Sequence, residues 1–347
     1  MTDQVAMATT DDGRRAARAT PVQRVRARLV AAGAWLASLL PEGLVLRAAD
    51  GAGVLWYRLS PDRAAQARRN LARVSTYLVE HGLAGPRVAA AARDPRALES
   101  LVRAAFRNNA RYYVELTRVP RWDARMFRER VLVETPEVVE EAFSGDRPVI
   151  FLGLHFGAVE LPGLYLANRT GRRTTAPMET LADPALQAWF ASTRSRVGVR
   201  IVGLREARRE LTAALRRGEA VGLIADRDIT GGGLQVPFFG APAPMPIGPA
   251  LLAIESGAPI YVAAMRREGI GRYRGRLARV DVPAEGSRRE RVTGIVTAVA
   301  AAFEEAISHA PEQWWATFFP IWPDIEPAAT EERASTAGGP APEGNES

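Results

Sequence analysis

The sequence predicts an α/β fold with a mostly parallel central sheet flanked by helices, preceded by a basic helical region. After Arg130, short apolar runs alternate with amphipathic segments, a pattern typical of parallel α/β sheets. Before Arg130, apolar residues recur at helical spacing among arginines. With 347 residues, 47% of them hydrophobic and 24% charged, the chain has the composition of a folded protein with one large domain or two small ones.

The first 130 residues are expected to form helices. Residues 21–40 combine apolar positions with arginines in a basic amphipathic pattern that ends at Pro41. Three aromatic residues stand where such a region would anchor at the level of lipid headgroups: Trp35, Trp56 and Tyr57. Further helices are expected over 62–80 and 95–117. The alternative is a set of ordinary helices that pack on the next domain and keep their arginines in solvent.

The remainder of the chain supplies the expected sheet and its covering helices. Strands are expected over 149–154, 174–176, 199–202, 220–225 and 259–265, with a later edge strand over 272–282. Helices are expected over 136–143, 157–167, 184–197, 206–217, 249–255 and 291–308. We expect disorder over 1–20 and in the acidic, low-complexity tail over 326–347. The membrane-associating helical region over 21–130 and the α/β core over 131–325 then form one structural unit.

Positive charge is concentrated in the N-terminal third. The chain has no lysine, and its first 130 residues carry 23 arginines against 12 acidic residues, whereas residues 131–323 carry 22 against 21. This asymmetry indicates contact with a polyanion, either nucleic acid or an anionic membrane. The longest apolar run, residues 29–40, is shorter than the roughly 20 residues that span a bilayer. Because the first residues also lack the apolar segment of a signal peptide, we expect a cytoplasmic protein.

The residue inventory excludes several chemistries. The chain has no cysteine, which removes disulfides, thiolate nucleophiles and cysteine metal sites. It contains neither a G-x-S-x-G nucleophile elbow nor a P-loop motif. Of the three histidines, His81 and His309 stand at expected helix ends, where they are expected to act as caps. His155 is therefore the best candidate for a catalytic base.

His155 follows the most apolar strand candidate, at the strand end where ligands bind in open α/β sheets. Glu160 lies five residues later and can reach it if His155 stands in the turn before a helix that starts near Gly157. A carboxylate that accepts from one ring nitrogen fixes the tautomer and leaves the other nitrogen as a base. The alternative is a strand-end histidine that is satisfied by the backbone.

A second group of polar residues follows the strand candidate over 220–225. Asp226 and Asp228 point to the same side of an extended backbone. They could hold Mg²⁺, but Arg227 between them makes an ion pair the favoured use, and no metal site is expected. Phe238 and Phe239 follow a glycine-rich loop and form either the apolar wall of a pocket or part of the core.

In these motifs the chain resembles the bacterial lysophospholipid acyltransferase superfamily, in the branch of lipid A lauroyl acyltransferases and actinobacterial phosphatidylinositol mannoside acyltransferases. The family's H-x-x-x-x-[D/E] is met at 155–160, its D-R-D at 226–228, and its F-F-G and P-x-G-P-x-x-L-A at 238–240 and 246–253. The resemblance covers about residues 22–324. The motifs A-R-x-N-L-A-R-V at 67–74 and A-R-Y-Y at 110–113 are similar to the mannoside branch.

The resemblance implies transfer of a fatty acyl chain from acyl-CoA, as co-substrate and without a cofactor, to a mannose hydroxyl of a phosphatidylinositol mannoside. It implies that His155 is the general base and that Glu160 orients and stabilises its ring. It places acidic residues by the acceptor sugar and an arginine by a substrate phosphate. The substrate-binding residues expected on this basis are Glu179, Arg194, Arg196, Asp226, Arg227, Asp228, Phe238 and Phe239. Backbone N–H groups near Phe156 and Gly157 are the expected oxyanion donors.

Other functions stay open at this point. They are acylation of a lipid A-like glycolipid, hydrolysis of a lipid ester or thioester by the same His–Glu pair, and a non-catalytic role in binding a membrane surface. Nucleic acid is not expected as a partner, because the helices carry no DNA-reading motif and the aromatic residues lie among aliphatic ones. We expect a peripheral protein that binds the anionic cytoplasmic face of the plasma membrane, with a binding strength that falls as salt is added.

Overall fold

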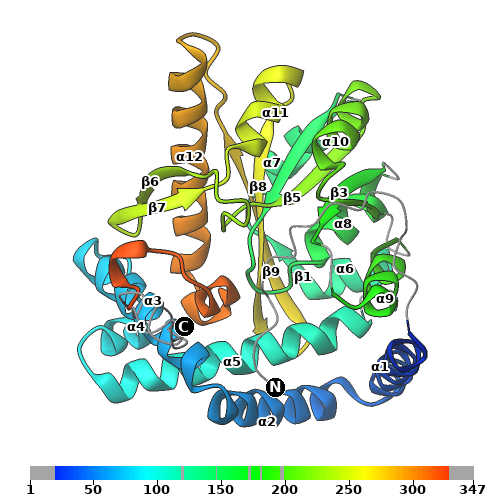
Figure 1. Cartoon of the computed structure of the whole chain (residues 1–347), viewed down its shortest axis with the longest axis vertical. Helices are drawn as coiled ribbons and strands as arrows, with labels where there is room; N and C mark the ends of the chain where they lie inside the picture. The colour runs from blue at the N-terminus through cyan, green and yellow to red at the C-terminus, as the bar shows by residue number, and fades with distance from the viewer. Residues whose placement is uncertain are drawn as a thin grey trace, which may run out of the picture.

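The computed structural model describes residues 20–118, 121–145, 147–170, 173–179, 182–195 and 199–327. The expected disordered tails lie outside these residues, apart from Thr20, Glu326 and Pro327. A seven-stranded sheet in the order β1-β9-β8-β2-β5-β3-β4 forms the centre of the molecule (Figure 1). Its strands are β1 (Val131–Val133), β2 (Val149–Gly153), β3 (Thr174–Met178), β4 (Val199–Gly203), β5 (Ala220–Ile224), β8 (Ile260–Gly269) and β9 (Arg272–Val280). Every pair is parallel except β8 and β9, which confirms the mostly parallel α/β class.

Two details of the sheet differ from the expectation. The strand β1 was not expected, and it pairs with β9, which therefore does not lie at the edge of the sheet. A run of three residues is too short to give a recognisable alternation. A separate antiparallel hairpin, β6 (Leu234–Phe238) and β7 (Ala241–Met245), occupies a segment for which no strand was expected.

Helices form most of the described residues from Pro21 to Arg130. These helices are α1 (Pro21–Leu39), α2 (Glu42–Leu59), α3 (Pro61–Glu80), α4 (Pro86–Ala91), α5 (Pro95–Arg118) and α6 (Ala124–Arg130). The helix α2 was missed because its glycines weaken a helical prediction. A Cβ atom at Gly53 would lie 2.7 Å from Arg107 Cα, so glycine is what lets α2 pack closely against α5. The two helices run side by side below the sheet in Figure 1.

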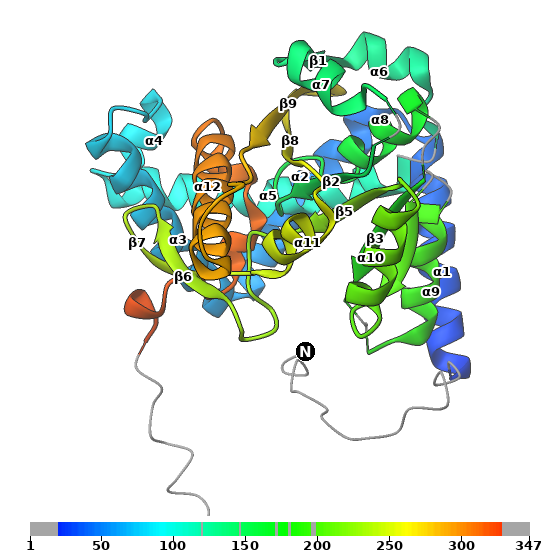
Figure 2. The same ribbon diagram turned by 90° about the horizontal axis from the view of Figure 1, so that it is seen from above.

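Helices cover both faces of the sheet, as Figure 2 shows from above. They are α7 (Pro136–Phe143), α8 (Leu161–Thr170), α9 (Pro184–Ser195), α10 (Ala207–Arg216), α11 (Gly248–Ser256) and α12 (Arg288–Ser308). Alternate residues of a strand face opposite sides. In β2, Ile150 and Leu152 join the main core with α10, α11 and α12, while Val149 and Phe151 face α7 and α8.

The helix α1 lies at the outside of the molecule beside α9 (Figures 1 and 2). Arg26 Nε donates to Asp183 Oδ2 at 2.9 Å, which joins α1 to the residue that precedes α9. The apolar side chains of α1 are largely exposed: Val22, Val25, Leu29, Val30, Trp35, Leu36 and Leu39. Trp56 and Tyr57 differ from Trp35, since both pack inward against Phe106. Within the described ranges, no helix is both long enough and apolar enough to cross a bilayer.

Candidate active site

His155 and Asp226 meet at the carboxyl ends of two neighbouring strands. In the parallel pair β2 and β5, Gly153 is opposite Ile224, so the residues two positions beyond each strand end come together. His155 Nδ1 lies 2.7 Å from Asp226 Oδ1, and the backbone N–H of His155 donates to Oδ2 at 2.9 Å. When Nδ1 donates to the carboxylate, Nε2 is the nitrogen left to accept a proton.

Two tryptophans complete the surroundings of this pair. Trp314 Nε1 donates to Asp226 Oδ2 at 2.8 Å, and the Trp315 ring packs edge-on against the His155 ring with centroids 4.4 Å apart. Asp226 is buried, and burial alone would raise the pKa of its carboxyl; the charge of His155 and the hydrogen bonds from His155 and Trp314 outweigh this and hold the pKa below its usual value. Asp226 is thus an anion positioned to stabilise a charged imidazole.

A large apolar cavity adjoins His155 on the sheet face that carries α7 and α8. Its volume is about 570 Å³. Small residues on this face leave room beside the sheet, among them Gly153, Gly222 and Ala263. Aromatic and aliphatic side chains form the walls, including Phe143, Phe151, Tyr165, Ile201 and Leu277. A preformed apolar channel of this kind suits a long hydrocarbon chain.

The expected pairing of His155 with Glu160 is wrong. In the described part of the chain, the Glu160 carboxylate accepts from Arg194 Nη2 at 2.8 Å and from the Tyr112 hydroxyl at 3.1 Å, and Asp226 takes its place beside His155. Burial disfavours the charge of Arg194, yet Glu160 outweighs this effect and raises the pKa of Arg194. Glu160 therefore fixes Arg194 at the wall of the cavity.

The helix after His155 also starts later than expected, at Leu161 rather than near Gly157. Gly157 has a positive φ of 54°, and a Cβ there would lie 2.0 Å from the Met265 carbonyl oxygen. Only glycine fits this turn. The backbone N–H groups of Phe156, Gly157 and Ala158 already donate to Leu154, Gln313 and Met265, so the expected oxyanion donors are occupied.

Glu179 and Arg227 lie together at the cavity. Arg227 Nη2 donates to Glu179 Oε1 at 3.2 Å. The Arg227 guanidinium also stacks on Phe319, with its central carbon 3.9 Å from the ring centroid. All three residues line the cavity. Arg196 lies outside the described residues.

Three residues expected at the substrate site serve the fold instead. Asp228 accepts from the backbone N–H groups of Thr230, Gly231 and Gly233, which shapes the glycine-rich loop. Phe238 and Phe239 are buried in the core against Trp314 and Trp322. Neither phenylalanine is among the described residues that line the cavity. The core alternative for these two residues is therefore the correct one.

Comparison with known proteins identifies the class. Residues 16–317 match the family of bacterial lipid A biosynthesis acyltransferases. The chain therefore belongs to this family and is an acyltransferase, which confirms the resemblance inferred from its motifs.

Among its relatives are phosphatidylinositol mannoside acyltransferases. The protein of that name from Mycolicibacterium smegmatis is 30% identical over 289 residues, which cover 82% of this chain and 87% of the relative. The one from Mycobacterium tuberculosis is 31% identical over 291 residues, which cover 82% of this chain and 84% of the relative.

Proposed function

We propose that the protein transfers a long fatty acyl chain from acyl-CoA to a mannose hydroxyl of a phosphatidylinositol mannoside. The observation that carries this proposal is the His155–Asp226 pair beside an apolar cavity of about 570 Å³. The names of the mycobacterial relatives supply the acceptor class. The resemblance to the family implies acyl-CoA as the donor, whose thioester a hydroxyl can attack directly, without an acyl-enzyme.

The positions of the two side chains support the following proposed reaction. Nε2 of His155 accepts the proton of the mannose hydroxyl as its oxygen attacks the thioester carbonyl. The tetrahedral intermediate collapses, its carbon–sulfur bond breaks, and the departing thiolate takes the proton from Nε2. The products are the ester and free CoA. Asp226 stays ionised throughout and stabilises the transient imidazolium.

The charged residues at the cavity are suited to the polar parts of the substrates. Arg194 and Arg227 are the cations that would face phosphate, and Glu179 is the carboxylate that would face sugar hydroxyls. The apolar channel under α7 and α8 would hold the acyl chain of the donor. The names of the mycobacterial relatives favour the mannoside over a lipid A-like acceptor.

The exposed apolar face of α1 supports attachment to the cytoplasmic face of the plasma membrane. Val22, Leu29 and Trp35 are 76%, 68% and 60% exposed, and arginines flank them in the same helix. A helix of this kind lies in the headgroup region of an anionic leaflet. Attachment there would hold the enzyme beside both of its lipid substrates.

The test uses the purified protein with palmitoyl-CoA and phosphatidylinositol dimannoside, and mass spectrometry of the lipid product. We expect one added palmitoyl group on a mannose, and no added group with His155→Ala. Stoichiometric free fatty acid without acylated acceptor would instead establish a hydrolase. Transfer to a lipid A precursor in preference to the mannoside would establish the other acceptor class.

A further inference from the structure

A buried ion pair lies behind the turn that carries His155. Arg267, in β8, donates from Nε to Glu115 Oε1 at 2.6 Å and from Nη2 to Oε2 at 2.5 Å. The two side chains are only 4% and 9% exposed. The Tyr273 hydroxyl donates to the same carboxylate at 2.9 Å. Burial, together with the charge of Glu115, raises the pKa of Tyr273, so this hydroxyl keeps its proton.

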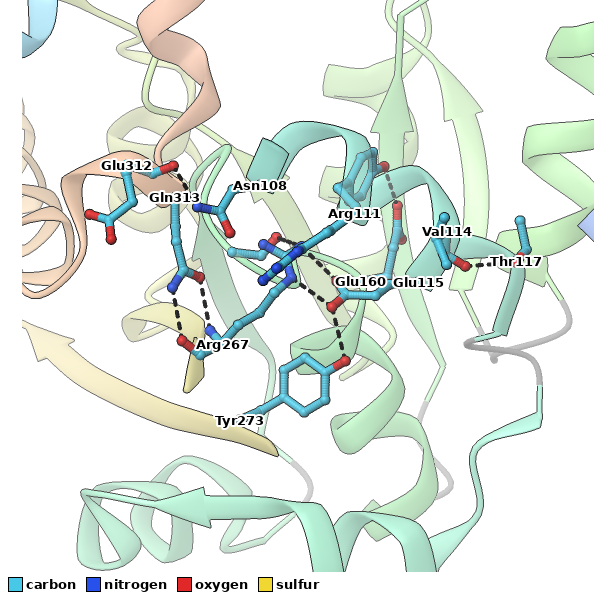
Figure 3. A network of polar contacts seen from close by, with 12 residues as sticks. Asn108, Arg111, Val114, Glu115, Thr117, Glu160, Arg267, Tyr273, Glu312 and Gln313 are labelled. Carbon is cyan, nitrogen blue, oxygen red and sulfur yellow. Dashed lines mark hydrogen bonds and ion pairs between the residues drawn. The ribbon is translucent and has the colours of Figure 1, made fainter. Parts of the chain in front are cut away.

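The same guanidinium holds the catalytic turn. Arg267 Nη2 donates to the Gly157 carbonyl oxygen at 2.8 Å. The N–H of the same glycine donates to the Gln313 carbonyl oxygen at 3.0 Å. The Gln313 side chain in turn bonds the backbone N–H and carbonyl of Arg267, both at 2.8 Å. Figure 3 shows Gln313 at the backbone end of Arg267 and Glu115 at its guanidinium end.

This ion pair is a poor source of stability. Taking two charges out of water costs about as much as their attraction returns. Arg267 Nη1 is also buried without a hydrogen-bond partner among the described residues, which adds to the cost. The pair does, however, supply the hydrogen bond from Arg267 to the Gly157 carbonyl oxygen. Two apolar side chains would not supply this bond.

Glu115 belongs to a polar stripe along α5. Asn108, Tyr112 and Glu115 are spaced four and three residues apart, which places them on one face of the helix. Asn108 Nδ2 donates to the Glu312 carbonyl, next to Gln313, and Tyr112 donates to Glu160. Through these three side chains, α5 contacts the segments that carry Glu160, Arg267 and Glu312.

We propose that Glu115 and Arg267 are positioning residues for His155. They fix the Gly157 peptide, and with it the turn that presents Nε2 to the cavity. This inference rests on the proposed acyl transfer, in which a small displacement of the base costs rate rather than substrate binding.

The first experiment replaces Arg267 by lysine. An ammonium group keeps the charge beside Glu115 but lacks the planar fork that serves the carboxylate and the Gly157 carbonyl together. We expect kcat to fall about 100-fold while KM for palmitoyl-CoA stays unchanged. The matched control is Arg266→Lys, because Arg266 is the next residue of β8 and pairs with Glu134. The control is expected to keep the wild-type kcat, and equal losses in both variants would overturn the proposal.

A double variant removes the problem of an unpaired buried charge. Glu115→Gln combined with Arg267→Met deletes both charges and leaves an amide oxygen for the Tyr273 hydroxyl. We expect a folded protein whose thermal midpoint is close to that of the wild type and whose kcat remains low. A double variant with wild-type kcat would show that the turn needs no bond from Arg267.

An activity-independent measurement separates this inference from the proposed function. The chain has three histidines, so ¹⁵N-histidine spectra contain few signals, and His155→Ala assigns the one of interest. Arg267→Lys is expected to shift the ring nitrogens of His155, whereas Arg266→Lys is not. Unchanged His155 signals in Arg267→Lys would contradict the positioning role. If the wild type transfers no acyl group, the proposed function fails. The spectra still show whether Arg267 positions His155.

Discussion

Asp226 accepts two hydrogen bonds from His155, one from ring Nδ1 at 2.7 Å and one from the backbone N–H at 2.9 Å. The ring bond selects the tautomer, and the backbone bond ties the carboxylate to the strand end that carries the histidine. Together the two contacts use both oxygens of Asp226 as acceptors, which the ionised carboxylate provides and an amide does not.

Asp226→Asn is therefore expected to lower kcat for acyl transfer by about 10²–10⁴-fold, since an amide does not stabilise the imidazolium. Steady-state kinetics with palmitoyl-CoA measure the effect. Asp228→Asn is the matched control, because Asp228 belongs to the same motif but holds a loop. If both variants lost activity equally, Asp226 would have no special role.

The hydrogen-bond partners of Glu160 predict which residues it is coupled to energetically. Unfolding free energies of Glu160→Gln and Arg194→Met are expected to be non-additive by about 0.5–3 kcal/mol, because the two side chains are in contact. Glu160→Gln combined with Asp226→Asn is expected to be additive within about 0.5 kcal/mol. Urea titrations of the single and double variants provide the numbers. Strong coupling between Glu160 and Asp226 would indicate that both carboxylates contact His155, as the His155–Glu160 pairing expected from the sequence requires.

The cavity predicts how the enzyme selects chain length. Gly222 lies opposite Phe151 in the sheet and faces the cavity, so Gly222→Leu fills part of the channel. We expect the ratio of kcat/KM for palmitoyl-CoA to that for lauroyl-CoA to fall by about 10–200-fold. Val221→Leu is the control, since Val221 faces the main core on the other side of the sheet. An unchanged ratio in Gly222→Leu would place the acyl chain elsewhere.

The lowered pKa of Asp226 predicts a loss of stability in acid. Its pKa is lower in the folded protein than the usual 3.8. The ionised carboxylate therefore contributes its full stabilisation above pH 3.8, and this stabilisation is lost as the pH falls through the pKa of the folded state. At pH 6, Asp226→Asn is expected to be less stable than the wild type by about 1–3 kcal/mol. By pH 3 the difference is expected to shrink. Urea unfolding of both proteins at pH 6 and pH 3 tests this expectation. A difference in stability that grows toward pH 3 would contradict it.

The exposed face of α1 predicts membrane binding that depends on both apolar contact and charge. Trp35→Asp is expected to reduce binding to vesicles that contain anionic phospholipid, and added salt is expected to weaken binding of the wild type. Leu83→Asp is the control, because Leu83 is 58% exposed, close to the 60% of Trp35, but lies between α3 and α4. Vesicle flotation measures both effects. Equal binding by the two variants would argue against α1 as the contact.

The order of elements along the chain could be predicted from the sequence, because it depends on local periodicity. The strands before His155 and Asp226 were found in this way, as was the end of the sheet at which polar residues gather. The neighbours in the sheet were not predictable, since β2 and β5 are separated along the chain by two other strands. For this reason Glu160, near in sequence, was chosen as the partner of His155 in place of Asp226.

Other residues of the site could not be predicted, because the sequence around them has no recognisable motif or periodicity. Trp314 and Trp315 follow the short 3-10 turn η2 (Pro311–Gln313), and nothing in their spacing indicates contact with Asp226 or His155. Tyr112 was noticed within the A-R-Y-Y motif, but its bond to Glu160 depends on how α5 packs. The left-handed conformation of Gly157 likewise results from tertiary contacts with Met265 and Gln313.

The two faces of the sheet are filled unequally, since one is packed by α10, α11 and α12 while the other borders the cavity. A long-chain donor bound there would add apolar contacts that exist only in the native state. Such a molecule stabilises the folded state in addition to being a substrate, and a higher concentration of it shifts the equilibrium from unfolded to folded protein. The supply of acyl donor would then govern how long each enzyme molecule survives, in addition to how fast it turns over.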